Sequence, residues 1–136
     1  MTPPNLKAKK LNISGDIDVA YAALGAKNYA KDIGFSKADQ YMISTAVSEL
    51  ARNICTYAKN GTINLSFVKN NSKKGIEVVA EDWGPGIQDI DKAMKDNFST
   101  GGTMGVGLPG TRRLMDDFQF DSHRTQGTRI IIRKWI

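Results

Sequence analysis

Two helical patterns follow one another near the start of the chain, and this order constrains the fold more than any other feature. Residues 16–33 carry apolar side chains at helical spacing and are followed by Gly34, a residue type that often ends a helix. Ser36, with Asp39 three residues later, is similar to a capping box and predicts a second helix that ends near Ala58. Strands and helices alternate in a doubly wound sheet, so two successive helices favour another fold class.

Short apolar runs predict the strands of that fold. They lie at residues 7–13, 63–67, 76–80, 118–123 and 128–135. The run at 76–80 is almost continuously apolar, which favours a central place in the sheet. Residues 70–74 predict a hairpin loop. The paired strands, together with helices expected near 89–96 and over 108–117, indicate an α+β two-layer sandwich.

Length and composition suit a single domain spanning residues 1–136, with 40% hydrophobic and 24% charged residues. No apolar run approaches the roughly 18 residues of a membrane span, and the first residues lack the apolar stretch of a signal peptide. Cys55 is the only cysteine, which excludes an internal disulfide and a multi-cysteine zinc site. We therefore expect a cytoplasmic protein without a membrane partner.

The net charge of +5 raises the question of a nucleic-acid partner. However, the basic residues are scattered along the chain, and the longest basic-rich stretch contains only Lys7, Lys9 and Lys10. A nucleic-acid-binding domain usually gathers its positive charge on one face or along one helix. We expect no nucleic acid among the partners.

The first candidate site lies on the second expected helix, where Glu49 and Asn53 are four residues apart and share a face. A carboxylate beside a carboxamide suits a hard cation and a polarised hydroxyl group. The alternative is an ordinary solvated helix face, on which Arg52 balances the charge of Glu49. Both interpretations stay open at this point.

The second candidate site follows the expected central strand and reads E-D-W-G-P-G-I at 81–87. The glycines Gly84 and Gly86 allow the backbone to approach a ligand closely. The carboxylate of Asp82, at the end of a strand, is well placed to accept a hydrogen bond from a base. A plain strand-to-loop turn explains the same residues equally well.

The third candidate site is the stretch 99–110, in which five glycines and three hydroxyl residues lead into a helix with Pro109 in its first turn. Such a loop presents unpaired N–H groups, and a helix N-terminus adds partial positive charge, so the stretch suits a phosphate group. The alternative is a flexible surface loop.

Two common nucleotide motifs fail on this stretch. Gly105, Gly107 and Gly110 spell G-x-G-x-x-G, but no strand directly precedes them and residues 124–136 contain no Asp or Glu for a ribose. A Walker A loop requires Lys and then Ser or Thr after its last glycine, whereas Leu108 follows Gly107.

In this order the three candidate sites resemble the conserved boxes of the GHKL ATPases, which have the Bergerat fold. The pattern is E-x-x-x-N on a helix, then D-x-G-x-G after a strand, then G-x-G in a lid. Within that superfamily the chain is most similar to bacterial serine kinases, above all the switch kinases of stressosomes. The similar segments are E-L-A-R-N-I at 49–54, E-D-W-G-P-G-I at 81–87, F-S-T-G-G at 98–102, G-L-P-G at 107–110 and R-L-M-D at 113–116.

The resemblance implies a mixed, mostly antiparallel sheet with helices on one face, and an ATP site. Asn53 would ligate Mg²⁺ and Glu49 would be the general base for a serine hydroxyl. Asp82, assisted by Thr128, would accept from the adenine amino group. The resemblance places the remaining residues around the nucleotide. Gly84 and Gly86 would lie beside adenine, Gly101, Gly102 and Thr103 in a lid over 97–104, and Gly105, Val106 and Gly107 at the phosphate oxygens.

The resemblance leaves one role open. Some relatives place Lys or Arg a few residues beyond the asparagine, where it can touch phosphate, whereas this chain has Thr56 there. No Lys or Arg occurs between residues 97 and 110. The cation that faces the terminal phosphate therefore stays open among Arg52, Lys59 and Arg112.

The resemblance also implies a function. The chain would phosphorylate a serine of a STAS-domain antagonist and, once released, bind and activate a PP2C-type phosphatase, in connection with a large stressosome-like assembly. One alternative is an anti-sigma factor kinase that sequesters a sigma factor. Another is an ATP-dependent binding module without catalysis, and the presence of Glu49 argues against it.

Overall fold

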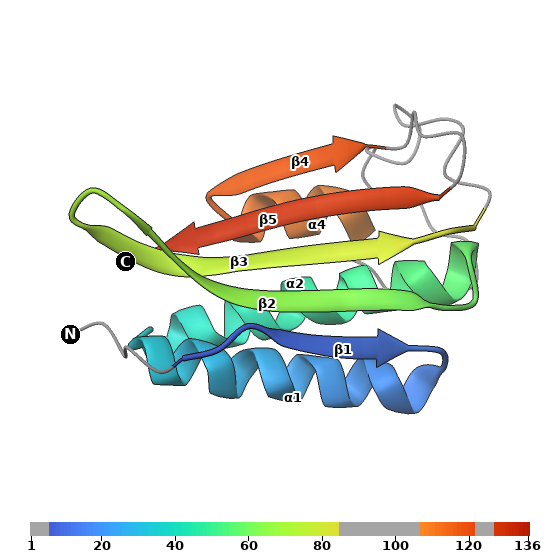
Figure 1. The fold of residues 1–136 in the computed structure, drawn as a ribbon, viewed down its shortest axis with the longest axis horizontal. Coiled ribbons are helices and arrows are strands. Elements are labelled where there is room, and N and C mark those ends of the chain that lie inside the picture. Colours follow the sequence, from blue (N-terminus) through green and yellow to red (C-terminus); the bar gives the residue numbers. More distant parts are fainter. Residues whose placement is uncertain (1–5, 85–106, 122–126) are drawn as a thin grey trace.

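A computed structural model describes residues 6–84, 107–121 and 127–136 of the chain. Its strands are β1 (Lys9–Ile13), β2 (Gly61–Asn70), β3 (Lys73–Asp82), β4 (Asp117–Asp121) and β5 (Thr128–Trp135), and its helices are α1 (Asp16–Ile33), α2 (Lys37–Tyr57) and α4 (Gly107–Leu114). The strands form one sheet in the order β1-β2-β3-β5-β4, and every neighbouring pair is antiparallel. The three helices lie on one face of this sheet (Figure 1). The predicted α+β sandwich is confirmed.

Local signals fix the two long helices where the sequence predicts them. α1 ends at Gly34, whose φ of 114° is left-handed and whose N–H donates to the carbonyls of Ala30 and Lys31. The hydroxyl of Ser36 accepts from the N–H of Asp39 at 3.2 Å and thereby caps α2. Both predicted boundaries are therefore confirmed to within a residue.

The hairpin between β2 and β3 is tighter than predicted. Asn70 pairs with Lys73, so the loop expected at 70–74 reduces to a two-residue turn. Asn71 has a φ of 57° in this turn, a conformation that asparagine tolerates better than most residues. β3 is the third of five strands in the sheet, which confirms its predicted central place.

The predicted helix over 108–117 is too long at its C-terminal end. α4 ends at Leu114, and β4 starts at Asp117. The N–H of Asp116 donates to the carbonyl of Arg133, and the carboxylates of Asp116 and Asp117 accept from the backbone N–H and the indole N–H of Trp135. Because of these contacts with β5, the helix ends earlier than the spacing of apolar residues predicts. The short helix predicted near 89–96 lies outside the described residues.

The core lies between the sheet and the helices. Alternate residues of the central strands are fully buried in this core, among them Ile63, Leu65, Ile76, Val78 and Ile132. Burying each such side chain contributes roughly 1.5–3 kcal/mol. Leu50 of α2 belongs to the same core, so α2 is held beneath the strands. No helix in the described part of the chain is long and apolar enough to cross a membrane.

Candidate nucleotide site

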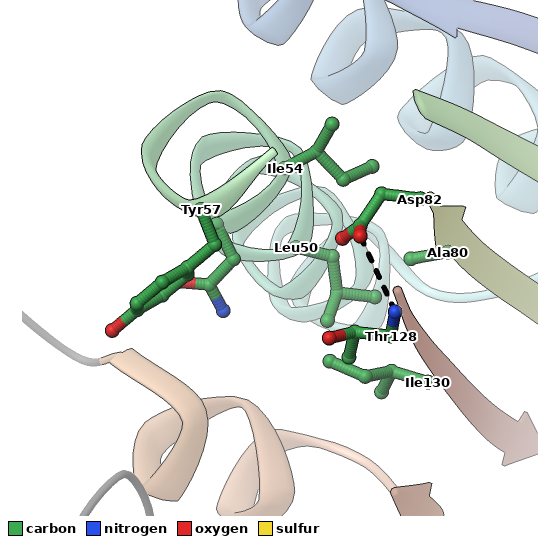
Figure 2. A pocket seen from close by; sticks show the side chains of 8 residues that line it. Leu50, Ile54, Tyr57, Ala80, Asp82, Thr128 and Ile130 are labelled. Atoms are coloured by element: carbon green, nitrogen blue, oxygen red, sulfur yellow. Dashed lines mark hydrogen bonds between the residues drawn. The ribbon is translucent and has the colours of Figure 1, made fainter. Parts of the chain in front are cut away.

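One pocket lies between α2 and the neighbouring ends of β3 and β5 (Figure 2). It is lined by Leu50, Asn53, Ile54, Tyr57, Ala80, Asp82, Thr128 and Ile130. Three elements distant in sequence therefore build it. Its walls are mostly apolar and include a few polar groups, as in a small-molecule site, but the described residues leave a cavity of only about 10 Å³, room for about one water molecule.

The carboxylate of Asp82 is fixed at one side of this pocket. Asp82 ends β3 and pairs with Thr128, the first residue of β5. Its Oδ1 accepts from the N–H of Thr128 at 3.2 Å (Figure 2) and from the N–H of Gly84 at 3.1 Å. The residue is only 5% exposed. Because a buried carboxylate is costly without donors, these two contacts stabilise it in place.

Two polar atoms of the pocket lack a partner among the residues that the structure describes. Within the described residues, the Nδ2 of Asn53 and the Oγ1 of Thr128 are buried and make no hydrogen bond. Leaving such a group unpaired costs about 1–3 kcal/mol. Since most buried polar groups in folded proteins are paired, two unpaired groups in one pocket suit a ligand that supplies their partners.

Glu49 lies one turn before Asn53 on α2 and is 7% exposed. Its Oε1 accepts from the Nη1 of Arg52 at 2.8 Å, as the alternative interpretation of a balanced pair expected. The same interpretation expected a solvated face, and the burial of Glu49 shows that part to be wrong. A nearly buried carboxylate is thus held by an arginine whose own side chain is 41% exposed.

Cys55 follows on the same helix and is half-buried against the core. Burial, with smaller contributions from Asp16 and Asp18, raises the pKa of its thiol, and Arg52 opposes this shift. A thiol with a raised pKa is mostly protonated at neutral pH and is a weak nucleophile. The residue is therefore part of the packing.

Two glycines are required by close contacts around the pocket. A Cβ at Gly84 would come within 2.6 Å of the Cβ of Ala58 and 3.0 Å of the carbonyl oxygen of Tyr57, so Gly84 lets the β3 exit pack on the end of α2. Gly127 has a φ of 82°, and its Cβ would lie 1.9 Å from the carbonyl oxygen of Asp82. The sequence interpretation named Gly84 for another role and did not single out Gly127.

The structure brings Asn53, Asp82 and Thr128 together in one pocket, as expected, with Glu49 one turn away on α2. Gly107 begins α4, and Pro109 lies in its first turn as predicted. The remaining expected site residues lie outside the described residues: Gly86 beside adenine, and Gly101, Gly102, Thr103, Gly105 and Val106 in the lid and at the phosphates. Sequence reasoning missed the apolar walls, because Leu50, Ile54 and Ile130 follow the same spacing as ordinary core residues.

The family model for the histidine kinase-like ATPase domain matches residues 16–134. The chain therefore belongs to the histidine kinase-like ATPase family and is an ATP-binding domain. Within this family it is 48% identical over 126 residues to the serine/threonine-protein kinase RsbT of Bacillus subtilis, which covers 93% of the chain and 95% of the relative. The predicted enzyme class, a protein serine/threonine kinase, is confirmed by this match.

Three further matches share less of their sequence with the chain. The anti-sigma F factor of Thermoanaerobacter sp. (strain X514) is 33% identical over 100 residues, or 69% of the chain and 68% of the relative. The RsbU and RsbW domains of a Mycobacterium tuberculosis protein match with a TM-score of 0.62 at 15% identity, covering 94% of the chain and 31% of that structure. The catalytic domain of histidine kinase ThkA matches with a TM-score of 0.52 at 15% identity, covering 93% of the chain and 95% of that structure. These structures share the fold.

Proposed function

We propose that residues 1–136 act as one ATP- and Mg²⁺-dependent kinase domain that phosphorylates a serine of a STAS-domain antagonist. The observation that carries this proposal is the pocket in which Asp82 adjoins groups of Asn53 and Thr128 that have no partner in the described part of the chain, with buried Glu49 one turn away. The identity with RsbT supports the kinase activity, and the resemblance to switch kinases supports the substrate class.

Adenine recognition falls to Asp82 and Thr128 in this proposal. The Asp82 carboxylate accepts from the adenine amino group, and the Thr128 hydroxyl gains a partner on the base, directly or through water. Apolar neighbours such as Leu50 and Ile130 suit the faces of a flat ring, for which the cavity of about 10 Å³ would have to widen. The backbone at Gly105 to Gly107 is proposed for the phosphates, in keeping with an anion at a helix N-terminus.

Asn53 is the proposed ligand of Mg²⁺, which would neutralise phosphate charge. Its Nδ2 is buried without a partner among the described residues, and a rotation of the amide exchanges this nitrogen with the oxygen that a hard cation prefers. The side chain can therefore present a ligand atom without disturbing another hydrogen bond at that position.

Glu49 is the proposed general base. Its carboxylate orients the serine hydroxyl and takes the proton as the oxygen forms its bond to phosphorus, and ADP leaves. Positioning and charge neutralisation supply most of the catalysis in phosphoryl transfer, so a base fixed on a packed helix is well suited to this step. The burial of Glu49 suits the assignment, because packing holds the carboxylate in a fixed position for the transfer.

The exposed side of α1 is the proposed surface for the protein partners, together with the lid. Ile17, Tyr21 and Leu24 lie at helical spacing and are 72%, 67% and 54% exposed. An apolar stripe on the outside of a helix is typical of an interaction site. After release from the antagonist, the same surface would bind and activate a PP2C-type phosphatase in a cytoplasmic, stressosome-like system.

The second candidate function is an anti-sigma factor kinase that also sequesters a sigma factor. The 33% identity with an anti-sigma F factor favours it, whereas the higher identity and wider coverage of RsbT favour the switch kinase. Co-purification with a sigma factor, rather than with a phosphatase, would decide for this second candidate.

The proposed function is tested by transfer of radiolabel from ATP to a purified STAS-domain antagonist. We expect phosphoserine on the antagonist in the presence of Mg²⁺ and no transfer with EDTA. An antagonist with alanine at the labelled serine is the matched control. Failure of the folded wild-type protein to label any antagonist with Mg²⁺ would overturn the proposal.

A further inference from the structure

We infer that Arg52 is the cation that contacts the terminal phosphate of ATP, and that it leaves Glu49 to do so. This inference rests on the proposed kinase function. In the described structure the Nη1 of Arg52 donates to the Oε1 of Glu49 at 2.8 Å. The exchange would connect the presence of the triphosphate to the release of the general base.

The position of Arg52 favours it over the other two candidate cations. Arg52 is on α2, directly before Asn53 and three residues after Glu49. Arg112, on α4, lines a different groove with residues of β4 and β5, among them Phe118 and Arg133. Lys59 is exposed beyond the end of α2. Of the three, only Arg52 contacts a residue of the candidate site among the described contacts.

The geometry of the pair allows an exchange. The Glu49 side chain is 9% exposed, so its position is restrained by packing, whereas that of Arg52 is 41% exposed and can reorient. The guanidinium group uses one donor on Glu49 in the described contacts and has five in all. A terminal phosphate carries more charge than a carboxylate and accepts arginine in a bidentate manner, so it can compete for the same group.

The exchange has a consequence for Glu49. While Arg52 donates to Oε1, that oxygen is occupied and the carboxylate charge is neutralised. Once the guanidinium moves to phosphate, the oxygen becomes available for the serine hydroxyl. Arg52 would then serve the reaction twice, by contacting the terminal phosphate and by withholding the base when no triphosphate is bound.

The test compares the affinities of a non-hydrolysable ATP analogue and of ADP, measured by calorimetry with Mg²⁺. We expect Arg52→Gln to lose about tenfold or more in affinity for the analogue, the scale of a charge-assisted hydrogen bond, with ADP affinity unchanged. The affinity of Arg52→Lys for the analogue should lie between those of Arg52→Gln and the wild type. Arg112→Gln should bind the analogue as tightly as the wild type. Unchanged ADP binding also shows that the variant is folded.

A double-mutant cycle tests the exchange itself. Glu49→Gln removes the competing carboxylate and should raise affinity for the ATP analogue in the wild-type background, but much less in the Arg52→Gln background. An unchanged preference for the analogue in Arg52→Gln, or equal effects of Glu49→Gln in both backgrounds, would overturn the inference. A wild-type protein that binds neither nucleotide would instead overturn the proposed function.

Discussion

At the scale of single residues, Asp82 has two separable tasks. Its Oδ1 connects the start of β5 to the exit of β3 through the N–H groups of Thr128 and Gly84. The proposed adenine contact would use the acceptor capacity of the same carboxylate. A substitution that keeps the oxygen that accepts from the two backbone N–H groups, but changes the acceptor proposed for adenine, separates the two tasks.

We predict that Asp82→Asn weakens ATP binding by about 2–3 kcal/mol while the protein stays folded, since the amide oxygen can still accept from both backbone groups. Asp82→Ala should lose the internal contacts as well and also lower the free energy of unfolding. Calorimetry with ATP and chemical denaturation measure the two effects. Wild-type protein that binds GTP as tightly as ATP would contradict the assignment, because guanine presents a carbonyl where adenine has its amino group.

At the scale of elements, the pocket depends on how β5 begins. Gly127 has a left-handed φ, and a side chain there would collide with the backbone of Asp82. By contrast, Gly25 lies inside α1, where an added Cβ meets only the Leu11 side chain at an ordinary 3.7 Å. The two glycines therefore provide a matched pair of substitutions.

We predict that Gly127→Ala lowers the free energy of unfolding by at least about 2 kcal/mol, from backbone strain and the collision, and weakens ATP binding with it. Gly25→Ala should raise stability by about 0.5–1 kcal/mol, because glycine inside a helix is unfavourable. Urea denaturation of the two variants checks both signs. A neutral Gly127→Ala would show that β5 can begin in another way.

The elements also show where sequence reasoning succeeds. Helix caps are local signals, so Gly34 sufficed to place the end of α1 and Ser36 the start of α2. The start of β4 depends on Trp135, 18 residues away, whose indole donates to Asp117. The helical spacing of the preceding residues therefore predicted a helix that is too long at its C-terminal end. Contacts between segments distant in sequence decide such a boundary, and propensity alone does not contain them.

At the scale of the whole molecule, the same distinction applies to the site. Asn53, Asp82 and Thr128 could be named from motifs, but their meeting depends on the pairing of β3 with β5 across 46 residues. The apolar walls could not be named, because a side chain that lines a pocket and one that fills the core have the same chemistry. The choice of Arg52 among the three candidate cations required the observed contact with Glu49.

The exposed stripe on α1 leads to a prediction about the partners. A phosphoserine adds about two negative charges, which the carboxylates Glu49 and Asp82 would repel, so the phosphorylated antagonist should leave. The phosphatase could then occupy the same surface. We predict that antagonist and phosphatase compete, and that Tyr21→Ala weakens both complexes. Size-exclusion chromatography of the three proteins tests this, and a stable ternary complex would contradict it.

The central claim is that Glu49 is the base of a protein-serine kinase, and phosphoryl transfer by Glu49→Gln tests it most directly. The variant should bind ATP and the antagonist at least as well as the wild type, which calorimetry verifies. It should transfer radiolabel to the antagonist at least about 100-fold more slowly, the usual scale for the loss of a general base. Transfer at the wild-type rate would contradict the account and leave Glu49 a structural partner of Arg52.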